Sequence, residues 1–238
     1  MRKFFYLLLL TLVWGSADAQ SLPPVWLGST DVQYSTRTIA YLPPTRIVWQ
    51  ETSGSSSIEG IDKLLLPGNG QAELVGGKEC VIRQRPDGKV SVLLDFGREL
   101  QGGIQIVTGQ SSRKEAKVRI RFGESVSEAM CDITPENGAT NDHAIRDFHF
   151  TLPWLGVAEI GNSGFRFVRI DVEEPDIDLL LKEVRATFGY RDIPYLGSFK
   201  SDNNRLNDIW MTGAYTVHLN MQEYIWDGVK RDRLVWIG

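Results

Sequence analysis

Short runs of alternating apolar and polar residues, separated by Gly, Pro, Asn and Asp, extend from about Leu22 to Tyr195. The clearest is Lys89–Phe96, in which every second residue from Val90 onward is apolar, as in a strand that buries one face. Pro86-Asp87-Gly88 before it is typical of a tight turn, because Pro holds φ at about −65° and Gly accepts positive φ. Many short strands without a helical pattern between them predict an antiparallel β-sandwich or jelly roll over residues 20–195.

Two other runs indicate which strands are central. Lys117–Phe122 alternates basic with apolar residues, which predicts one wet and one buried face. Phe165–Val172 instead carries apolar residues in both registers. We therefore expect this second run to form a central strand that is covered on both sides.

The pattern changes after Pro194, where apolar residues recur at spacings of three and four. This spacing predicts an amphipathic helix that Ser201 could cap. Its apolar stripe consists of Leu206, Ile209, Trp210, Gly213, Ala214, Val217 and Met221. A single helix cannot bury its own stripe, so we expect residues 196–238 to be the truncated start of a second, helical domain.

The N-terminus has the three parts of a secretory signal peptide. Arg2 and Lys3 precede an apolar run from Phe4 to Trp14, and Ala17-Asp18-Ala19 resembles a cleavage site. The run is shorter than the roughly 20 residues that a membrane-spanning helix needs. Residues 1–19 are therefore predicted to direct export to the periplasm or the extracellular space, without leaving a membrane anchor.

The charge balance argues against two classes of partner. A formal net charge of −4 and a pI near 5.5 give no basic excess for binding nucleic acid or an anionic membrane surface. Export would permit a disulfide between Cys80 and Cys131, but two buried free thiols remain an equal alternative. The three histidines, His143, His149 and His218, lack the spacing of a zinc site, so no metal is predicted.

The last twelve residues, DGVKRDRLVWIG, combine carboxylates, basic side chains and a tryptophan. Carboxylates can move protons and flat rings can pack against a sugar, although such a charge run is more often a solvated surface. In a regular helix Asp227 and Asp232 would lie about 140° apart around the axis. Both could face one substrate only across a break in the helix, for which Gly228 is suited.

This segment resembles the signature around the catalytic carboxylates of bacterial α-L-rhamnosidases of glycoside hydrolase family 78. The positions in register are Asp227, Arg231, Asp232, Arg233, Leu234, Trp236 and Gly238. The upstream stretches LDFGRELQGGIQI, VRIRFGESVSEAM and GFRFVRIDV resemble the β-sandwich that precedes the catalytic domain in this family. Two departures stand out: many members have Glu at the position of Asp232, and Gly228-Val229 replaces the usual Cys-Pro.

The resemblance implies a secreted glycosidase in which the β-sandwich precedes a six-hairpin (α/α) toroid, of which only the first helix is present here. It implies hydrolysis of terminal α-L-rhamnosyl linkages of glycans or glycosides with inversion of configuration, and no cofactor. Asp232 would be the catalytic general acid, and Asp227, Arg231 and Trp236 would bind the substrate. The general base would lie further downstream, so residues 1–238 alone are expected to be inactive.

Two other functions remain open from the sequence. The first is a non-catalytic, carbohydrate-binding β-sandwich protein, in which residues 20–195 would fold alone and bind a glycan. The second is another enzyme with a helical toroid, such as a different glycosidase or a polysaccharide lyase.

Overall fold

The computed structural model describes residues 37–74, 76–77, 79–132, 146–230 and 235. The predicted signal peptide lies outside this range. The strands are β1 (Thr38–Leu42), β2 (Arg46–Thr52), β3 (Ser57–Glu59), β4 (Cys80–Gln84), β5 (Val90–Thr108), β6 (Glu115–Gly123), β7 (Asp147–Pro153), β8 (Gly156–Val172) and β9 (Ile177–Tyr190). The helices are the 3-10 helix η1 (Ile61–Leu65) and the α-helices α2 (Val126–Met130) and α3 (Asn204–Asn220).

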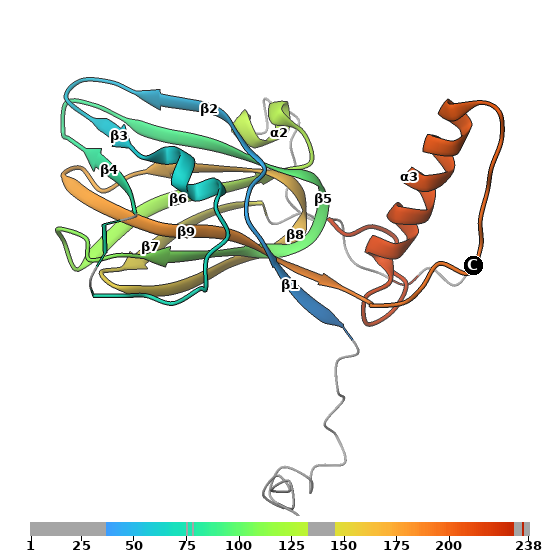
Figure 1. The fold of residues 1–238 in the computed structure, drawn as a ribbon. Coiled ribbons are helices and arrows are strands. Elements are labelled where there is room, and N and C mark those ends of the chain that lie inside the picture. The colour runs from blue at the N-terminus through green and yellow to red at the C-terminus, as the bar shows by residue number, and fades with distance from the viewer. Residues whose placement is uncertain (1–36, 75, 78, 133–145, 231–234, 236–238) are drawn as a thin grey trace, which may run out of the picture. The chain divides into compact units, whose positions relative to one another are not determined.

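All nine strands belong to one hydrogen-bonded sheet with antiparallel pairing, which confirms the predicted mainly-β, antiparallel class. The sheet forms two layers because β5 and β8 are long and run through both (Figure 1). The first half of β5 and the last part of β8 lie in a layer of order β2-β5-β8-β6-β7. Their other halves lie in a layer of order β3-β4-β9-β5-β8, with β1 on the end of β9.

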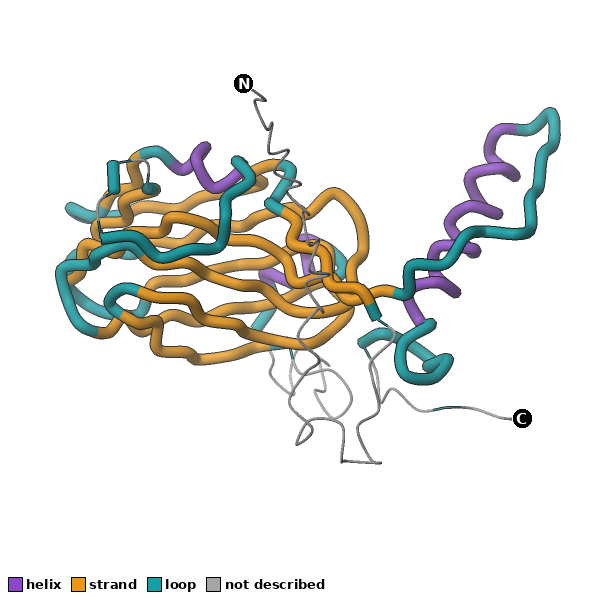
Figure 2. The backbone as a smooth tube through the Cα atoms, turned by 60° about the horizontal axis from the view of Figure 1, so that its bottom comes forward, coloured by secondary structure: helices purple, strands orange, loops and turns teal. Residues whose placement is uncertain are grey.

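The long strands bend between the layers, as the backbone trace in Figure 2 shows. Glycines with positive φ lie in these strands. Gly97 and Gly102 in β5 have φ values of 86° and 142°, and Gly161 in β8 has a φ of 83°. A side chain at Gly102 would overlap the carbonyl oxygen of Thr187 on the neighbouring strand. Only glycine combines positive φ with such a close backbone approach.

The main core lies between the two layers. It consists of the buried, inward-facing side chains of both layers together with Leu64 of η1. Phe122 is fully buried in it, with its ring edge-to-face against Phe148 and Phe165 at centroid distances of 5.7 and 5.0 Å. Edge-to-face pairs of this kind add to the stabilisation that comes from burial alone.

A smaller core lies on the outer face of the first layer. Leu93 of β5 and Phe167 of β8 are covered there by Ala129 of α2. Because Val168 and Ile170 face the main core, β8 is buried on both sides, as the apolar residues in both registers of Phe165–Val172 predicted.

Asp95, at the bend of β5, is 1% exposed and binds two guanidinium groups. Arg166 contacts its two carboxylate oxygens at 2.8 and 3.0 Å, and Arg46 contacts it at 2.9 Å. The backbone N–H of Gly97 donates a further hydrogen bond of 2.7 Å. Burial acts to raise the pKa of Asp95, but these hydrogen bonds and charges outweigh it and hold the pKa below its ordinary value.

We expect Asp95→Asn to lower the free energy of unfolding by about 1–3 kcal/mol at pH 7, because it removes charge-assisted hydrogen bonds from a buried position. Because the pKa of Asp95 is lower in the folded state, its ionised carboxylate stabilises the fold at pH values above the ordinary pKa of 3.8. This stabilisation is lost as the pH falls through the folded-state pKa. The difference from wild type in urea unfolding should therefore shrink on going from pH 7 to pH 3. A difference that stays constant down to pH 3 would contradict this account.

Helix α3 begins later than the sequence indicated. Its N-cap is Asn203, whose side chain accepts a hydrogen bond from the backbone N–H of Arg205 at 3.0 Å. The prediction of Ser201 as the cap is wrong because its hydroxyl binds within the preceding turn, accepting from the N–H of Asn203 at 3.2 Å.

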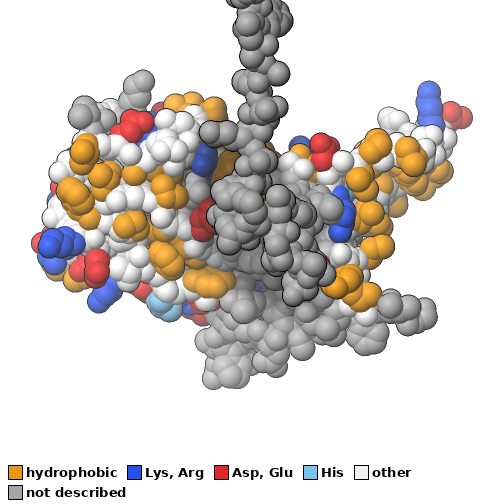
Figure 3. Space-filling view, turned by 90° about the horizontal axis from the view of Figure 1, so that it is seen from below, with side chains coloured by type: hydrophobic (Ala, Val, Ile, Leu, Met, Phe, Trp, Pro, Cys, Tyr) orange, Lys and Arg blue, Asp and Glu red, His pale blue; other side chains and the backbone are white. Residues whose placement is uncertain are grey.

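The apolar stripe of α3 remains largely exposed. Leu206, Ile209 and Val217 are 47%, 57% and 56% exposed. Figure 3 shows apolar side chains gathered in this part of the molecule. None of the helices in the described ranges is long and apolar enough to cross a membrane.

Both cysteines have free thiols. Cys80 is buried, and its burial raises the pKa of the thiol to about 12. Cys131 is only partly buried. Of the two alternatives that the sequence left open, the structure has the free thiols.

Candidate functional site

The signature segment begins in a loop that is fixed to the sandwich directly after α3. The buried side chain of Gln222 donates to the carbonyl oxygens of Leu219 and Gly189 at 2.8 and 3.1 Å. The backbone carbonyl oxygen of Gln222 accepts a hydrogen bond from Arg191 Nε at 2.7 Å. These bonds join the C-terminal end of α3 to the end of β9.

The residues from 221 to 230 contain no helix, so the break that the sequence analysis required near Gly228 is present up to Lys230. Asp227 is exposed in this loop. Asp232, Arg231 and Trp236 lie outside the described residues, and their roles stay predictions, as does that of Asp227.

Val229 and Lys230 attach the segment to the sandwich immediately before Asp232. Val229 is 7% exposed and lies against Gly164 of β8, where a larger residue would overlap its side chain. Lys230 forms an ion pair with Glu128 of α2. Glu128 also binds Arg146 at 2.6 Å, so α2 and the segment before β7 both contribute to this attachment.

The charges of two further carboxylates, Glu99 and Glu124, act on Lys230. We call Glu99, Glu124, Glu128 and Lys230 the carboxylate anchor. Glu99 Oε1 is buried and has no hydrogen-bond partner in the part of the chain that the structure describes. Burial, followed by the neighbouring charge of Glu124, raises the pKa of Glu99 to about 8. Burial also lowers the pKa of Lys230, while the charges of Glu124 and Glu99 oppose this.

An aromatic cavity of about 270 Å³ lies between the bend of β5, the end of β9 and α3. It is lined by Arg98, Phe188, Tyr190, Tyr195, Tyr215, His218 and Leu219. The hydroxyl of Tyr215 donates to the carbonyl oxygen of Glu99 at 2.5 Å, and burial raises its pKa to about 12. The cavity therefore joins α3 to the same bend that carries the carboxylate anchor.

His218 has a defined tautomer in this cavity. Its Nε2 lies 2.6 Å from the carbonyl oxygen of Arg191, which can only accept, so Nε2 carries the proton. In the neutral ring Nδ1 then accepts from the Tyr195 hydroxyl at 3.1 Å. His218 thus acts here as a structural hydrogen-bonding residue. No cluster of three metal-binding side chains occurs among the described residues.

We expect Glu99→Gln to change how stability depends on pH. The pKa of Glu99 is raised in the folded state, so the fold favours the protonated side chain. The contribution of this side chain to the free energy of unfolding is therefore complete below its ordinary pKa of 4.5 and is lost as the pH rises through about 8. A permanently neutral glutamine avoids this loss. In urea unfolding the variant should match wild type near pH 4.5 and exceed it at pH 8.5 by on the order of 2 kcal/mol.

The matched control is Glu51→Gln, which changes an exposed glutamate of β2. Because the side chain is exposed, this substitution should change the free energy of unfolding by less than about 0.5 kcal/mol. If the free energy of unfolding of Glu99→Gln differed from that of wild type by the same amount at pH 4.5 and pH 8.5, Glu99 would be charged at neutral pH and this account would be wrong.

The sequence matches no protein-family model and no curated protein. The structure superposes on that of a rhamnosidase from Klebsiella oxytoca with rhamnose bound, with a TM-score of 0.59 and 17% identity over 84% of this chain. A family 78 rhamnosidase from a Bacillus species gives a TM-score of 0.58 and 18% identity over 74% of this chain. The chain shares the fold of these rhamnosidases.

The match covers most of this chain but only 39% and 17% of the two rhamnosidase chains. The fold that the resemblance of the sequence implied for the β-sandwich is thereby confirmed. The carboxylate anchor was not found from the sequence, because its four residues come from three separate segments, around Glu99, Glu124–Glu128 and Lys230, that approach one another only in the fold.

Proposed function

We propose that residues 20–238 are the N-terminal part of a secreted α-L-rhamnosidase that hydrolyses terminal α-L-rhamnosyl linkages with inversion. Residues 1–19 are the export signal, residues 20–195 the β-sandwich domain, and residues 196–238 the start of a six-hairpin (α/α) catalytic domain. One observation carries the proposal: a rhamnosidase-like signature follows a chain whose fold superposes on two rhamnosidases. The exposed stripe of α3 supports it, because helices of such a domain would cover that face.

In this proposal Asp232 is the general acid that protonates the leaving oxygen. A second carboxylate, outside residues 1–238 and roughly 6.5–9.5 Å from the first, activates a water molecule on the opposite face of the sugar. Asp227 and Arg231 bind hydroxyl groups of rhamnose, and Trp236 packs against a face of the ring.

The carboxylate anchor gives the sandwich a part in this reaction. Lys230 lies two residues before Asp232, and its ion pair with Glu128 fixes the backbone at that point. Val229 adds an apolar contact with β8. Because small displacements of a catalytic group are costly, a fixed attachment next to the acid supports the assigned role.

The test is hydrolysis of 4-nitrophenyl α-L-rhamnopyranoside by the complete gene product. We expect release of 4-nitrophenolate from this substrate, and much slower release from the α-L-fucoside and the β-D-glucoside with the same leaving group. Proton NMR of the first-formed sugar should show β-L-rhamnose, because inversion converts the α linkage to the β anomer. No release from the rhamnoside would refute the activity, and the α anomer would refute inversion.

A further inference from the structure

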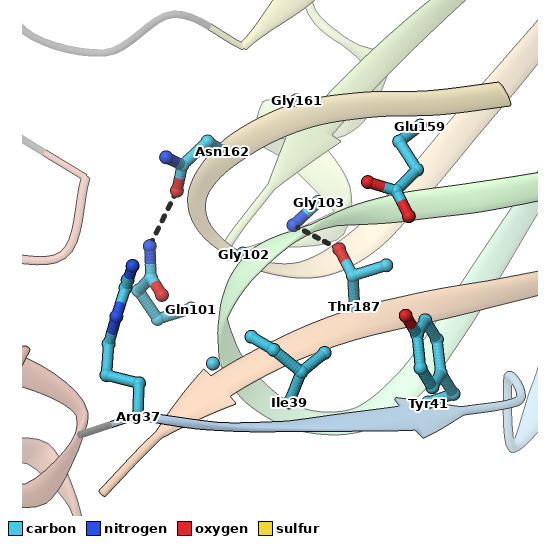
Figure 4. Close-up of a pocket in the computed structure, with 11 residues that line it drawn as sticks. Arg37, Ile39, Tyr41, Gln101, Gly102, Gly103, Glu159, Gly161, Asn162 and Thr187 are labelled. Carbon is cyan, nitrogen blue, oxygen red and sulfur yellow. Dashed lines mark hydrogen bonds between the residues drawn. The ribbon is translucent and has the colours of Figure 1, made fainter. Parts of the chain in front are cut away.

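A pocket of about 250 Å³ opens on the outer face of the second layer, where β1, β5, β8 and β9 meet (Figure 4). Ile104, Ile160 and Ala186 of these strands face the core, so Gln105, Glu159 and Thr187 beside them face outward. Four of the lining positions are glycines: Gly102, Gly103, Gly161 and Gly189. A side chain at Gly103 would overlap the backbone of β8, and one at Gly102 would overlap the carbonyl oxygen of Thr187, so only glycine fits at these two positions of the pocket.

One end of the pocket carries an ordered pair of amides. Gln101 is 1% exposed, and its Nε2 donates to Asn162 Oδ1 at 2.7 Å. Gln101 Oε1 receives no hydrogen bond from the described residues. A buried amide that is oriented by one hydrogen bond and keeps a second acceptor available is well suited to bind a ligand hydroxyl.

The other end carries an aromatic ring and a carboxylate. Tyr41 is 47% exposed, and the guanidinium carbon of Arg185 lies 4.1 Å from its ring centroid. Arg185 Nε in turn donates to Gln105 Oε1 at 2.8 Å, so the guanidinium beside the ring is held in place. The exposed carboxylate of Glu159 faces this end (Figure 4). It accepts a hydrogen bond from Gln105 Nε2 at 2.9 Å and has further lone pairs that can accept from a ligand.

Between these two ends lies Thr187, whose hydroxyl oxygen accepts from the N–H of Gly103 at 3.2 Å. The hydroxyl hydrogen is therefore directed away from that bond and can be donated. The pocket thus presents an amide acceptor, a hydroxyl donor, a carboxylate acceptor and a flat ring around one small space.

The charges decide which small polar molecule fits. Arg37 pairs with Glu223 at 2.6 Å and Arg185 with Glu183 at 3.2 Å, so both cations are balanced. Glu159 has no basic partner among the described residues, and it would repel an anion. The volume is below the roughly 300 Å³ at which pockets for drug-sized ligands begin.

We propose that this pocket binds a single neutral pyranose unit of a glycan without cleaving it. The hydroxyls of the sugar bind Gln101, Thr187 and Glu159, and a C–H face packs against Tyr41. Glycoside hydrolysis ordinarily needs two carboxyl groups across the scissile bond, whereas only Glu159 lines the described pocket. This binding does not depend on the proposed reaction at Asp232.

Saturation-transfer NMR with the whole protein tests this site, using methyl α-L-rhamnopyranoside, methyl α-D-glucopyranoside and sodium glucuronate as probes. We expect transfer to at least one neutral glycoside and none to glucuronate. Transfer to the rhamnoside is assigned to this pocket only where Tyr41→Ala lowers it, because the proposed reaction at Asp232 also binds rhamnosides. Tyr41→Ala should weaken the affinity about ten-fold, because the stacking face is lost. Glu159→Gln should permit transfer to glucuronate by removing the repulsion.

Tyr224→Ala, at a tyrosine that is 64% exposed and does not line the pocket, is the matched control and should leave binding unchanged. The melting temperature of each variant shows whether it is folded. If Tyr41→Ala is destabilised, Glu159→Gln alone decides through the change in selectivity. The proposal is overturned if neither neutral glycoside receives saturation, or if folded Tyr41→Ala and Glu159→Gln both bind as wild type does. Rhamnoside hydrolysis is measured separately, so each proposal can fail alone.

Discussion

Asp232→Asn in the complete gene product is expected to lower kcat for methyl α-L-rhamnopyranoside about 10²–10⁴-fold with little change in KM. Asparagine keeps the size of the side chain and its hydrogen bonding but has no proton to give to the leaving oxygen. Asp232 is assigned this role because it occupies the acid position of the rhamnosidase-like signature. The rate loss should come from the chemical step and not from substrate binding.

Lys114→Ala is the control for this variant, since Lys114 is exposed and lies outside the signature segment. It should retain the wild-type kcat and KM. Wild-type turnover in Asp232→Asn would show that this residue is not the general acid. Asp227, the other carboxylate of the segment, would then be the next candidate for that role.

Phe122→Ala is expected to lower the free energy of unfolding by about 3–5 kcal/mol. The ring is fully buried between the layers, and it lies 2.5 Å from where a Cβ at Gly161 would be. Its edge-to-face contacts with Phe148 and Phe165 would be lost together with its burial. Because the bend at Gly161 holds the two layers in place, the surrounding backbone cannot readily close the cavity.

Urea unfolding at pH 7 measures this loss, with Phe199→Ala as the matched control. Phe199 is 44% exposed and its ring stacks on Trp210, so its removal should cost less than about 1 kcal/mol. Similar losses in the two variants would show that the layers repack around the missing ring.

The sandwich was predictable because its signals are local. Alternation along Lys89–Phe96 and Phe165–Val172 reports which faces of a strand are buried, and neither depends on distant residues. The same signals could not show that β5 and β8 run through both layers. That feature depends on bends at Gly97, Gly102 and Gly161, which in the sequence could equally have marked turns.

The sites were predictable only in part. The signature segment could be recognised because its residues are consecutive, whereas Glu99, Glu124 and Glu128 approach Lys230 only after folding. Likewise, the sugar pocket arises from glycines on three strands and from Tyr41 on a fourth. The N-cap of α3 was misplaced by two residues because Ser201 and Asn203 are both good capping residues, and only the backbone geometry selects Asn203.

The dependence of the Asp232→Asn defect on the leaving group tests the central claim most directly. A 2,4-dinitrophenolate departs without protonation, whereas the methoxide of a methyl glycoside needs a proton from the acid. We predict that kcat/KM of the variant falls less than about ten-fold for 2,4-dinitrophenyl α-L-rhamnopyranoside and at least about 10²-fold for the methyl glycoside. Equal losses for the two substrates would contradict the assignment of Asp232 as the proton donor of an α-L-rhamnosidase.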